Sequence, residues 1–217
     1  EVVDVMPEQI KLAYLPGFGM VRLRLTVRGI ENEKTARELL DDFTKRLVEK
    51  VQPWVFGYDD DLLSKVIGKY LAEKGKMMGT AESCTGGNIA RIITADSGSS
   101  SYFKGSIIAY SNEIKVNVLG VQRDTLKHYG SVSEQTVREM VLGCVRLLEC
   151  DMAIATTGIA GPTGGTEEKP VGTVWIAATD GHQVQTRLLT LGNGRMKNIE
   201  FTTVAALNLL RKLLSRN

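Results

Sequence analysis

Histidine, cysteine and long apolar runs are all scarce in this sequence, and each scarcity excludes a class of protein. The 217 residues include two histidines and three cysteines. His128 and His182 lie near no cluster of further ligands, and the cysteines cannot all pair and show no CxxC spacing, so we expect no metal site and no disulfide framework. No apolar run approaches the length of a membrane span, and no signal peptide is recognisable. We therefore expect a cytoplasmic protein with no membrane partner.

Positive and negative side chains are nearly balanced in this sequence. Lys and Arg total 27 and Asp and Glu total 25, which gives a net charge of +2. Because the basic residues are spread along the chain, a dominant surface for nucleic acid or anionic lipid is not expected. With 43% hydrophobic and 24% charged residues, the chain can bury an ordinary globular core. Its length suits one large domain or two small ones.

Residues 1–58 predict a small α+β domain that is marginally stable alone. Residues 20–29 alternate apolar and polar side chains, the period-two pattern of a strand with one face in water. Residues 31–51 place apolar side chains on one stripe of a helix that begins with acidic residues. A further short strand is predicted at 54–58, directly after Pro53.

Residues 59–217 predict a second domain, in which strand-like and helix-like segments alternate. Such alternation favours an α/β fold, here a mixed sheet covered by helices on both faces. Gly75 is predicted to cap the end of the first helix and Ser133 the start of the second. The predicted helices are residues 60–75, 133–149 and 195–214. The predicted strands are residues 105–111, 151–158, 172–180 and 183–191, the last two joined as a hairpin.

The stretch TAESCTGG, residues 80–87, crowds polar and nucleophilic side chains into a few positions. It lies between an apolar entry, Met77 and Met78, and a run with helical spacing that begins at Ile89. This pattern predicts a strand, a tight turn and the start of a helix. A surface loop is the alternative, because Ser, Thr and Gly populate turns for conformational reasons alone.

Two more polar turns follow strand-like runs, namely residues 109–115 (AYSNEIK) and the glycine-rich residues 158–172. Ligands of open α/β sheets bind at the carboxyl ends of the strands, so the three turns are predicted to converge on one site. Backbone N–H groups of the glycine-rich turn could approach an anion closely, although a tight crossover is the alternative. It is not a P-loop, because Pro170 follows Lys169 where Ser or Thr would be needed.

The candidate nucleophiles are Ser83, Cys84, Thr85 and Ser111. Neither histidine is placed for a Ser-His-acid triad, so a lysine base is the next possibility. Lys115 is the natural one, because burial would lower its pKa and leave some neutral amine. The alternatives are a solvated side chain for Lys115, a core tyrosine for Tyr110 and a small buried hydrophobe for Cys84.

The segments AESCTGG, YSNEIK, GSVSEQTV, TGIAGPTGGTEEKPVGTV and GNGR occur in an order and spacing that resemble the C-terminal domain of the CinA (competence/damage-inducible) family. The resemblance covers about residues 60–217. Residues 1–58 are similar to the KH-like domain that joins the two catalytic domains of full-length CinA proteins. The chain would then be part of a longer protein and would lack the N-terminal molybdopterin-binding-like domain and its pyrophosphatase activity.

This resemblance implies a nicotinamide-nucleotide amidohydrolase. We expect it to need neither metal nor cofactor, because the histidines and cysteines offer no ligand cluster and serine with lysine can supply nucleophile and base. It would hydrolyse nicotinamide mononucleotide to nicotinic acid mononucleotide and ammonia, a step of pyridine nucleotide salvage. Ser83 would be the nucleophile, with Lys115 taking its proton and Tyr110 orienting the amide or relaying a proton to ammonia.

Substrate binding is implied for the turn after Ser83 and for the glycine-rich turn. The backbone N–H groups from Thr85 to Gly87 would stabilise an oxyanion or a phosphate. The family usually has GDR before its last helix, whereas this chain has GNGR at residues 192–195 and lacks the acidic residue. The substrate-binding residues implied are Thr85, Gly86, Gly87, Gly158, Gly161, Gly164, Gly165 and Arg195.

A rival function is a nucleic-acid-binding adaptor acting through residues 1–58. The segment YLPGFGMV, residues 14–21, precedes a strand and does not supply the GXXG loop between two helices that RNA-binding KH domains use. We therefore expect a nucleotide substrate and not a nucleic-acid partner. We also expect the chain to form a homo-oligomer, most simply a dimer.

Overall fold

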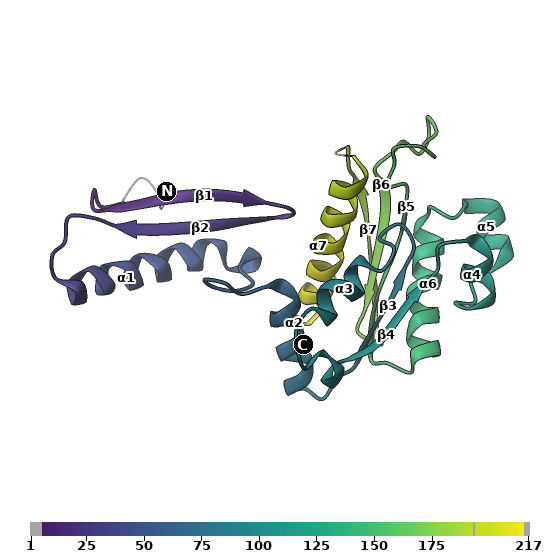
Figure 1. The fold of residues 1–217 in the computed structure, drawn as a ribbon, viewed down its shortest axis with the longest axis horizontal. Coiled ribbons are helices and arrows are strands. Elements are labelled where there is room, and N and C mark those ends of the chain that lie inside the picture. The colour runs from purple at the N-terminus through teal and green to yellow at the C-terminus, as the bar shows by residue number, and fades with distance from the viewer. Residues whose placement is uncertain (1–5, 193, 215–217) are drawn as a thin grey trace. The chain divides into compact units, whose positions relative to one another are not determined.

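A computed structural model describes residues 6–192 and 194–214 and divides the chain into two compact units, Glu1–Tyr58 and Asp59–Asn217 (Figure 1). The sheet of each unit is built from its own strands. No helix in the described ranges combines the length and apolar character needed to span a bilayer.

The first unit is a β-hairpin with one long helix. Strand β1 (Ile10–Gly17) pairs antiparallel with β2 (Met20–Val27), and α1 (Glu33–Val51) follows. The helix begins where predicted because the Asn32 side chain accepts a hydrogen bond of 3.1 Å from the Thr35 N–H. The described residues that are buried in this unit are Ile10, Phe43 and Leu47. A core this small agrees with the marginal stability predicted from its size.

The strand predicted at residues 54–58 is wrong. Instead, a 3-10 turn, η2 (Gln52–Trp54), follows α1, and the Val55 N–H bonds back to the Gln52 carbonyl at 3.2 Å. Pro53 favours this turn because it fixes its own φ and offers no N–H to a sheet. The KH-like domain expected here is not supported either, since the described residues form a hairpin and a single α-helix.

The second unit contains a five-stranded sheet in the order β4-β3-β5-β6-β7. Strands β4, β3 and β5 run parallel, and β6 and β7 are antiparallel additions, so the predicted mixed sheet is confirmed. The predicted hairpin at its edge is also present. The strands are β3 (Met78–Glu82), β4 (Phe103–Ile108), β5 (Met152–Gly158), β6 (Thr173–Thr179) and β7 (Val184–Thr190).

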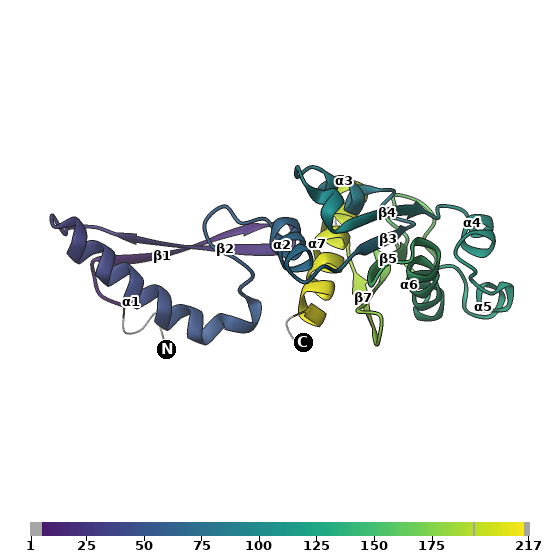
Figure 2. The same cartoon turned by 90° about the horizontal axis from the view of Figure 1, so that it is seen from below.

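Helices cover both faces of this sheet, as predicted. Helix α6 (Glu134–Leu148) packs on one face and α7 (Arg195–Leu214) on the other, which Figure 2 shows as helices on opposite sides of the strands. The Ser133 side chain caps α6 at the predicted residue by accepting from the Thr136 N–H at 3.2 Å. The remaining helices are α2 (Leu63–Glu73), α3 (Asn88–Thr94), η3 (Ser99–Ser101), α4 (Asn112–Asn117) and α5 (Arg123–Tyr129).

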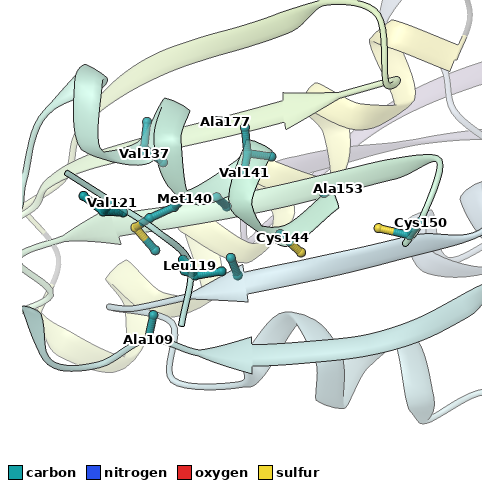
Figure 3. Packing of buried hydrophobic residues seen from close by; sticks show 12 residues of the cluster. Ala109, Leu119, Val121, Val137, Met140, Val141, Cys144, Cys150, Ala153 and Ala177 are labelled. Atoms are coloured by element: carbon teal, nitrogen blue, oxygen red, sulfur yellow. The ribbon is translucent and has the colours of Figure 1, made fainter. Parts of the chain in front are cut away.

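A core between α6 and the sheet anchors the segment that contains α4 (Figure 3). The strands contribute mainly alanines to this core, including Ala153 and Ala177, so a helix that carries larger side chains can approach closely. Ala109 and Leu119, which flank α4, are buried in the same core. Both ends of the α4 segment are therefore fixed by packing, and side chains on α4 have a defined position.

Candidate active site

The three polar turns begin at the same edge of the sheet, as predicted. Glu82, the last residue of β3, is in register with Ile108 on β4 and with Thr156 on β5. The Ser83 N–H donates to the Thr156 carbonyl at 3.0 Å, and the Ala109 N–H donates to the Glu82 carbonyl at 2.8 Å. The backbone at the start of the first two turns is thus hydrogen-bonded to a neighbouring strand.

Ser83 and Lys115 are in direct contact at this edge. The Lys115 Nζ lies 3.0 Å from the Ser83 Oγ and 2.9 Å from the Ala109 carbonyl oxygen. Ser83 is 7% exposed and Lys115 is 2% exposed. The Ser111 side chain caps α4 by accepting from the Ile114 N–H at 3.2 Å, so one helical turn carries Lys115 back toward Ser83. The alternative of a solvated lysine is wrong.

The surroundings of Lys115 favour the neutral amine. Burial lowers the pKa of Lys115 below its ordinary value, as the sequence predicted. Its hydrogen-bond partners are a hydroxyl and a carbonyl, and no carboxylate in the described ranges forms an ion pair with it. A neutral lysine amine has a lone pair that can accept a proton from a serine hydroxyl.

The other candidate nucleophiles are occupied in other ways. Burial raises the pKa of Cys84 to about 12, so this side chain is a thiol at neutral pH and fits the small buried hydrophobe considered from the sequence. The Thr85 Oγ1 is 2.8 Å from the Thr156 Oγ1. Ser111 serves as the exposed cap of α4. Ser83 is the candidate whose hydroxyl contacts the buried lysine.

Glu82 stands out from the sequence only as one polar residue of the stretch 80–87 and as an alternative base for direct attack by water, and its structural place at this edge was not predicted. Its carboxylate is fully buried, and three backbone N–H groups of the following turn and helix donate to it. Gly87 and Ile89 donate to Oε2 at 3.0 and 3.1 Å, and Ala90 donates to Oε1 at 2.9 Å. An acidic residue shortly before a helix start was a usable signal, but its spacing from α3 is not that of a standard cap.

These bonds correct the predicted use of the backbone after Ser83. The Gly87 N–H, expected to face an oxyanion or phosphate, donates to Glu82, and the Gly86 N–H donates to the Ser83 carbonyl at 3.1 Å. The N–H groups of Cys84 and Thr85 donate to no other residue in the described part of the chain. They follow Ser83 directly and are the free donors of the turn.

The glycine-rich turn is attached to the first turn of α7. The Arg195 Nη1 donates to the Gly161 carbonyl at 2.9 Å, and the Asn198 side chain donates to the Ala160 carbonyl at 3.1 Å. The Arg195 Nη2 also donates to the Tyr110 hydroxyl at 3.1 Å. Arg195 therefore joins the second and third polar turns. Tyr110 is 62% exposed and is not a core residue, and Asn198 was missed from the sequence.

Close packing accounts for three of the predicted substrate-binding glycines. A Cβ at Gly158 would meet Val174, and one at Gly161 or Gly165 would meet Val171. Close packing therefore explains these glycines, but the segment is a loop between the antiparallel neighbours β5 and β6 and not the crossover considered from the sequence. Gly164 and Gly86 are different: both have positive φ, +90° and +60°, and a Cβ would meet only Ile159, at 3.7 Å, or nothing within 4 Å. The backbone is accessible to a ligand at these two.

No group of three or more His, Cys, Asp and Glu side chains within the described ranges could hold a metal ion. His128 and His182 are both exposed, as expected of surface segments.

Fold and site together define a mixed-sheet α/β protein with a buried serine–lysine pair at the carboxyl edge of its parallel strands. Residues 60–214 match the family described as the CinA C-terminal domain. The chain therefore belongs to the CinA family.

Relatives of known sequence match almost the whole chain. CinA-like proteins of Cytophaga hutchinsonii and Amoebophilus asiaticus are each 42% identical over 209 residues, which cover 96% of this chain and 50% of each relative. The chain thus spans about half the length of the curated relatives it matches.

Solved structures match a smaller part of the chain. The competence/damage inducible protein CihA from Agrobacterium tumefaciens is similar with a TM-score of 0.70 and 37% identity, over 74% of this chain and 98% of that chain. The competence damage-inducible protein A (ComA) from Klebsiella pneumoniae is similar with a TM-score of 0.68 and 35% identity, over 70% of this chain and 95% of that chain.

Proposed function

We propose that this chain is a nicotinamide-nucleotide amidohydrolase that converts nicotinamide mononucleotide and water to nicotinic acid mononucleotide and ammonia. The observation that carries the proposal is the 3.0 Å contact between the Ser83 Oγ and the buried Lys115 Nζ in a protein of the CinA family. A carboxamide is a poor electrophile, so its hydrolysis needs an activated nucleophile and a base that can later return the proton. Serine with a neutral lysine supplies both.

The reaction begins with proton transfer from Ser83 to Lys115. The Ser83 Oγ attacks the carboxamide carbon while the neutral Lys115 amine takes the hydroxyl proton. The carbonyl oxygen becomes an oxyanion, and the free N–H groups of Cys84 and Thr85 are the donors available to stabilise it. The Ala109 carbonyl accepts one proton of Nζ and orients the amine toward Ser83.

Ammonia leaves when the tetrahedral intermediate collapses. The Lys115 ammonium returns the proton to the departing nitrogen, the C–N bond breaks and an ester with Ser83 remains. Water then attacks this ester, with Lys115 again taking the proton and delivering it to the Ser83 Oγ as the acid is released. The exposed Tyr110 hydroxyl accepts a hydrogen bond from Arg195, and we propose that it orients the amide or relays a proton.

The phosphate group of the substrate needs a site outside the start of α3, because Glu82 already holds those N–H groups. We propose Arg195, whose guanidinium can bind a phosphate through donors beyond the two used by Gly161 and Tyr110. The accessible backbone at Gly164 completes the proposed binding surface, whereas Gly86, whose N–H donates to the Ser83 carbonyl, offers only open space beside it.

Ammonia release from nicotinamide mononucleotide by the purified chain tests the proposal, with nicotinamide riboside as the matched substrate that lacks the phosphate. We expect release of ammonia together with nicotinic acid mononucleotide, and a higher KM for the riboside. Absence of any ammonia above an enzyme-free control would contradict the proposal.

We also propose that the enzyme acts without metal or cofactor, in the cytoplasm and as a dimer. Dialysis against a strong chelator should leave the rate unchanged, because serine and lysine supply nucleophile and base. A rate restored only by one divalent ion would contradict this part of the proposal.

A second candidate, a nucleic-acid-binding adaptor, has one observation in its favour. Residues 9–30 contain no acidic residue, and the hairpin register places Lys11, Arg22 and Arg24 on the same face. Fluorescence anisotropy with single-stranded RNA and DNA at two salt concentrations separates the candidates. Salt-dependent binding by a chain that releases no ammonia would favour the adaptor.

A further inference from the structure

We infer that Glu82 is a positioning residue for the nucleophile, acting through the backbone of the turn that carries Ser83. The inference rests on the proposed function only in that Ser83 is taken as the nucleophile. Within the described residues the Glu82 carboxylate forms no hydrogen bond with the Ser83 Oγ or the Lys115 Nζ, and it is fully buried. A role as the base that activates water is therefore unsuitable for it.

The carboxylate closes the turn between β3 and α3. Glu82 is the last residue of β3, and its two carboxylate oxygens accept hydrogen bonds from the N–H groups of Gly87, Ile89 and Ala90, on the far side of the turn. The hydroxyls of Thr80 and Ser106 approach Oε1 at 3.3 and 3.5 Å. Residues 83–86 therefore form the short segment between the end of β3 and the start of α3, and the Glu82 side chain holds these two ends together.

The backbone of Glu82 extends the same support to the lysine. Its carbonyl accepts the Ala109 N–H, and the Ala109 carbonyl in turn accepts from the Lys115 Nζ. Glu82 is therefore linked to both members of the pair, to Ser83 by the chain and to Lys115 through Ala109. Strand pairing alone does not fix the direction of the turn. The bonds of the Glu82 side chain fix it, and with it the direction of the free N–H groups of Cys84 and Thr85.

A carboxylate suits this position better than an amide. Three backbone N–H groups donate to the carboxylate, the Ser106 hydroxyl can donate to Oε1, and the Thr80 hydroxyl divides between Oε1 and Ser106 Oγ, so both oxygens act as acceptors. In Glu82→Gln one of these oxygens becomes an NH₂ group that faces donors, so at least one backbone N–H is left buried without a partner. We expect the turn to shift while the sheet and Lys115 stay in place.

The test is the labelling rate of Ser83 by a fluorophosphonate probe, which reports nucleophile, base and oxyanion donors without requiring the nucleotide substrate. The matched control is Glu139→Gln. Glu139 also accepts one backbone N–H, from Gln122 at 2.7 Å, and one hydroxyl, from Thr125 at 2.6 Å, but it lies on α6 and supports the start of α5. Circular dichroism and thermal unfolding establish that each variant is folded at the assay temperature.

We expect labelling of folded Glu82→Gln to be slower by about tenfold or more, since complete loss of one oxyanion donor costs about 100- to 1000-fold and the shifted turn would misplace its donors without removing them. The midpoint of its pH profile should not move, because Lys115 keeps its surroundings. Glu139→Gln should be labelled within about twofold of the wild-type rate, as for surface changes elsewhere. A purely structural role would lower the unfolding temperature of Glu82→Gln and leave labelling of the folded protein unchanged, and that result would overturn the inference.

A second variant decides the matter if Glu82→Gln fails to fold. Glu82→Asp keeps both acceptor oxygens but is one methylene shorter, and it should be labelled more slowly than wild type; a wild-type rate would overturn the inference. Failure of the proposed function gives a different pattern. Wild type would then be labelled at Ser83, with slower labelling of the Glu82 variants, but would release no ammonia from nicotinamide mononucleotide.

Discussion

Lys115 is an unusual residue because it is buried without a carboxylate partner in the described part of the chain. Its burial costs the charged form solvation, which is why its pKa is lowered. The same burial that would destabilise an ordinary lysine here prepares a base beside Ser83. Stability and reactivity at this residue therefore have opposite requirements.

The pH dependence of the rate should report this lysine. Below its pKa Lys115 is an ammonium that cannot accept a proton, so we expect kcat/KM to rise about tenfold per pH unit and to level off above the lowered pKa. The plateau should begin below about pH 10.4, the ordinary value for lysine. Ammonia release measured across this range checks the prediction, and a rate that falls as pH rises toward the plateau would contradict it.

The contact between Ser83 and Lys115 was predictable because both follow strands that end at one edge of the sheet. The role of the Glu82 carboxylate was not. A side chain that reaches across its own turn to Gly87, Ile89 and Ala90 depends on the path of that turn, which composition and periodicity do not specify.

At the scale of elements, the glycine-rich segment is a closely packed loop that joins the antiparallel neighbours β5 and β6. Gly172 has a φ of +93°, and a Cβ there would overlap the carbonyl of Leu191. Its own backbone bonds to both sides: its N–H donates to Ile159 at 2.7 Å and its carbonyl accepts from Leu191 at 2.9 Å. This position has no room to adjust.

Gly172→Ala should accordingly destabilise the second unit far more than a matched change. Gly98 has a similar φ of +87° but nothing within 4 Å of a Cβ, so Gly98→Ala should cost only the backbone strain, about 1–2 kcal/mol. Gly172→Ala adds overlap with fixed backbone and should cost about 3 kcal/mol or more. Urea unfolding measures both, and equal costs would contradict this reading of the turn.

Most elements of the second unit were predictable because periodicity and caps agree locally, as at Ser133 and at the closing helix. The failure at residues 54–58 has a different cause. An apolar and aromatic run becomes a strand only where it lies beside an open edge, and residues 54–58 pair with neither edge of the β1–β2 hairpin because the chain turns at η2, which contains Pro53. Sequence alone does not show whether such an edge is available.

At the scale of the whole molecule, the described pair of Ser83 and Lys115 and the turns around it belong to the second unit. The solved structures of similar proteins are matched over nearly their full length by only about three quarters of this chain. This correspondence favours a second unit that folds by itself.

A chain of residues 59–217 should therefore fold and retain the ammonia-release activity proposed for the 217-residue chain. We expect kcat/KM within about threefold of the longer chain, since the described contacts of the site come from this unit. Loss of activity in a shorter chain that is folded by circular dichroism would contradict the prediction and would give residues 1–58 a part in catalysis.

The most direct test of the account is steady-state ammonia release by wild type, Ser83→Ala, Lys115→Ala and the double variant, with substrate affinity measured by calorimetry. If Ser83 and Lys115 act in one step, each single change should lower turnover by a similar large factor, and the double change should cost little more. Binding should survive in Ser83→Ala because the phosphate site proposed at Arg195 and nearby backbone groups does not involve the Ser83 hydroxyl. Turnover near wild type in Ser83→Ala would contradict the covalent mechanism, and full activity in Lys115→Ala would remove lysine from the chemistry.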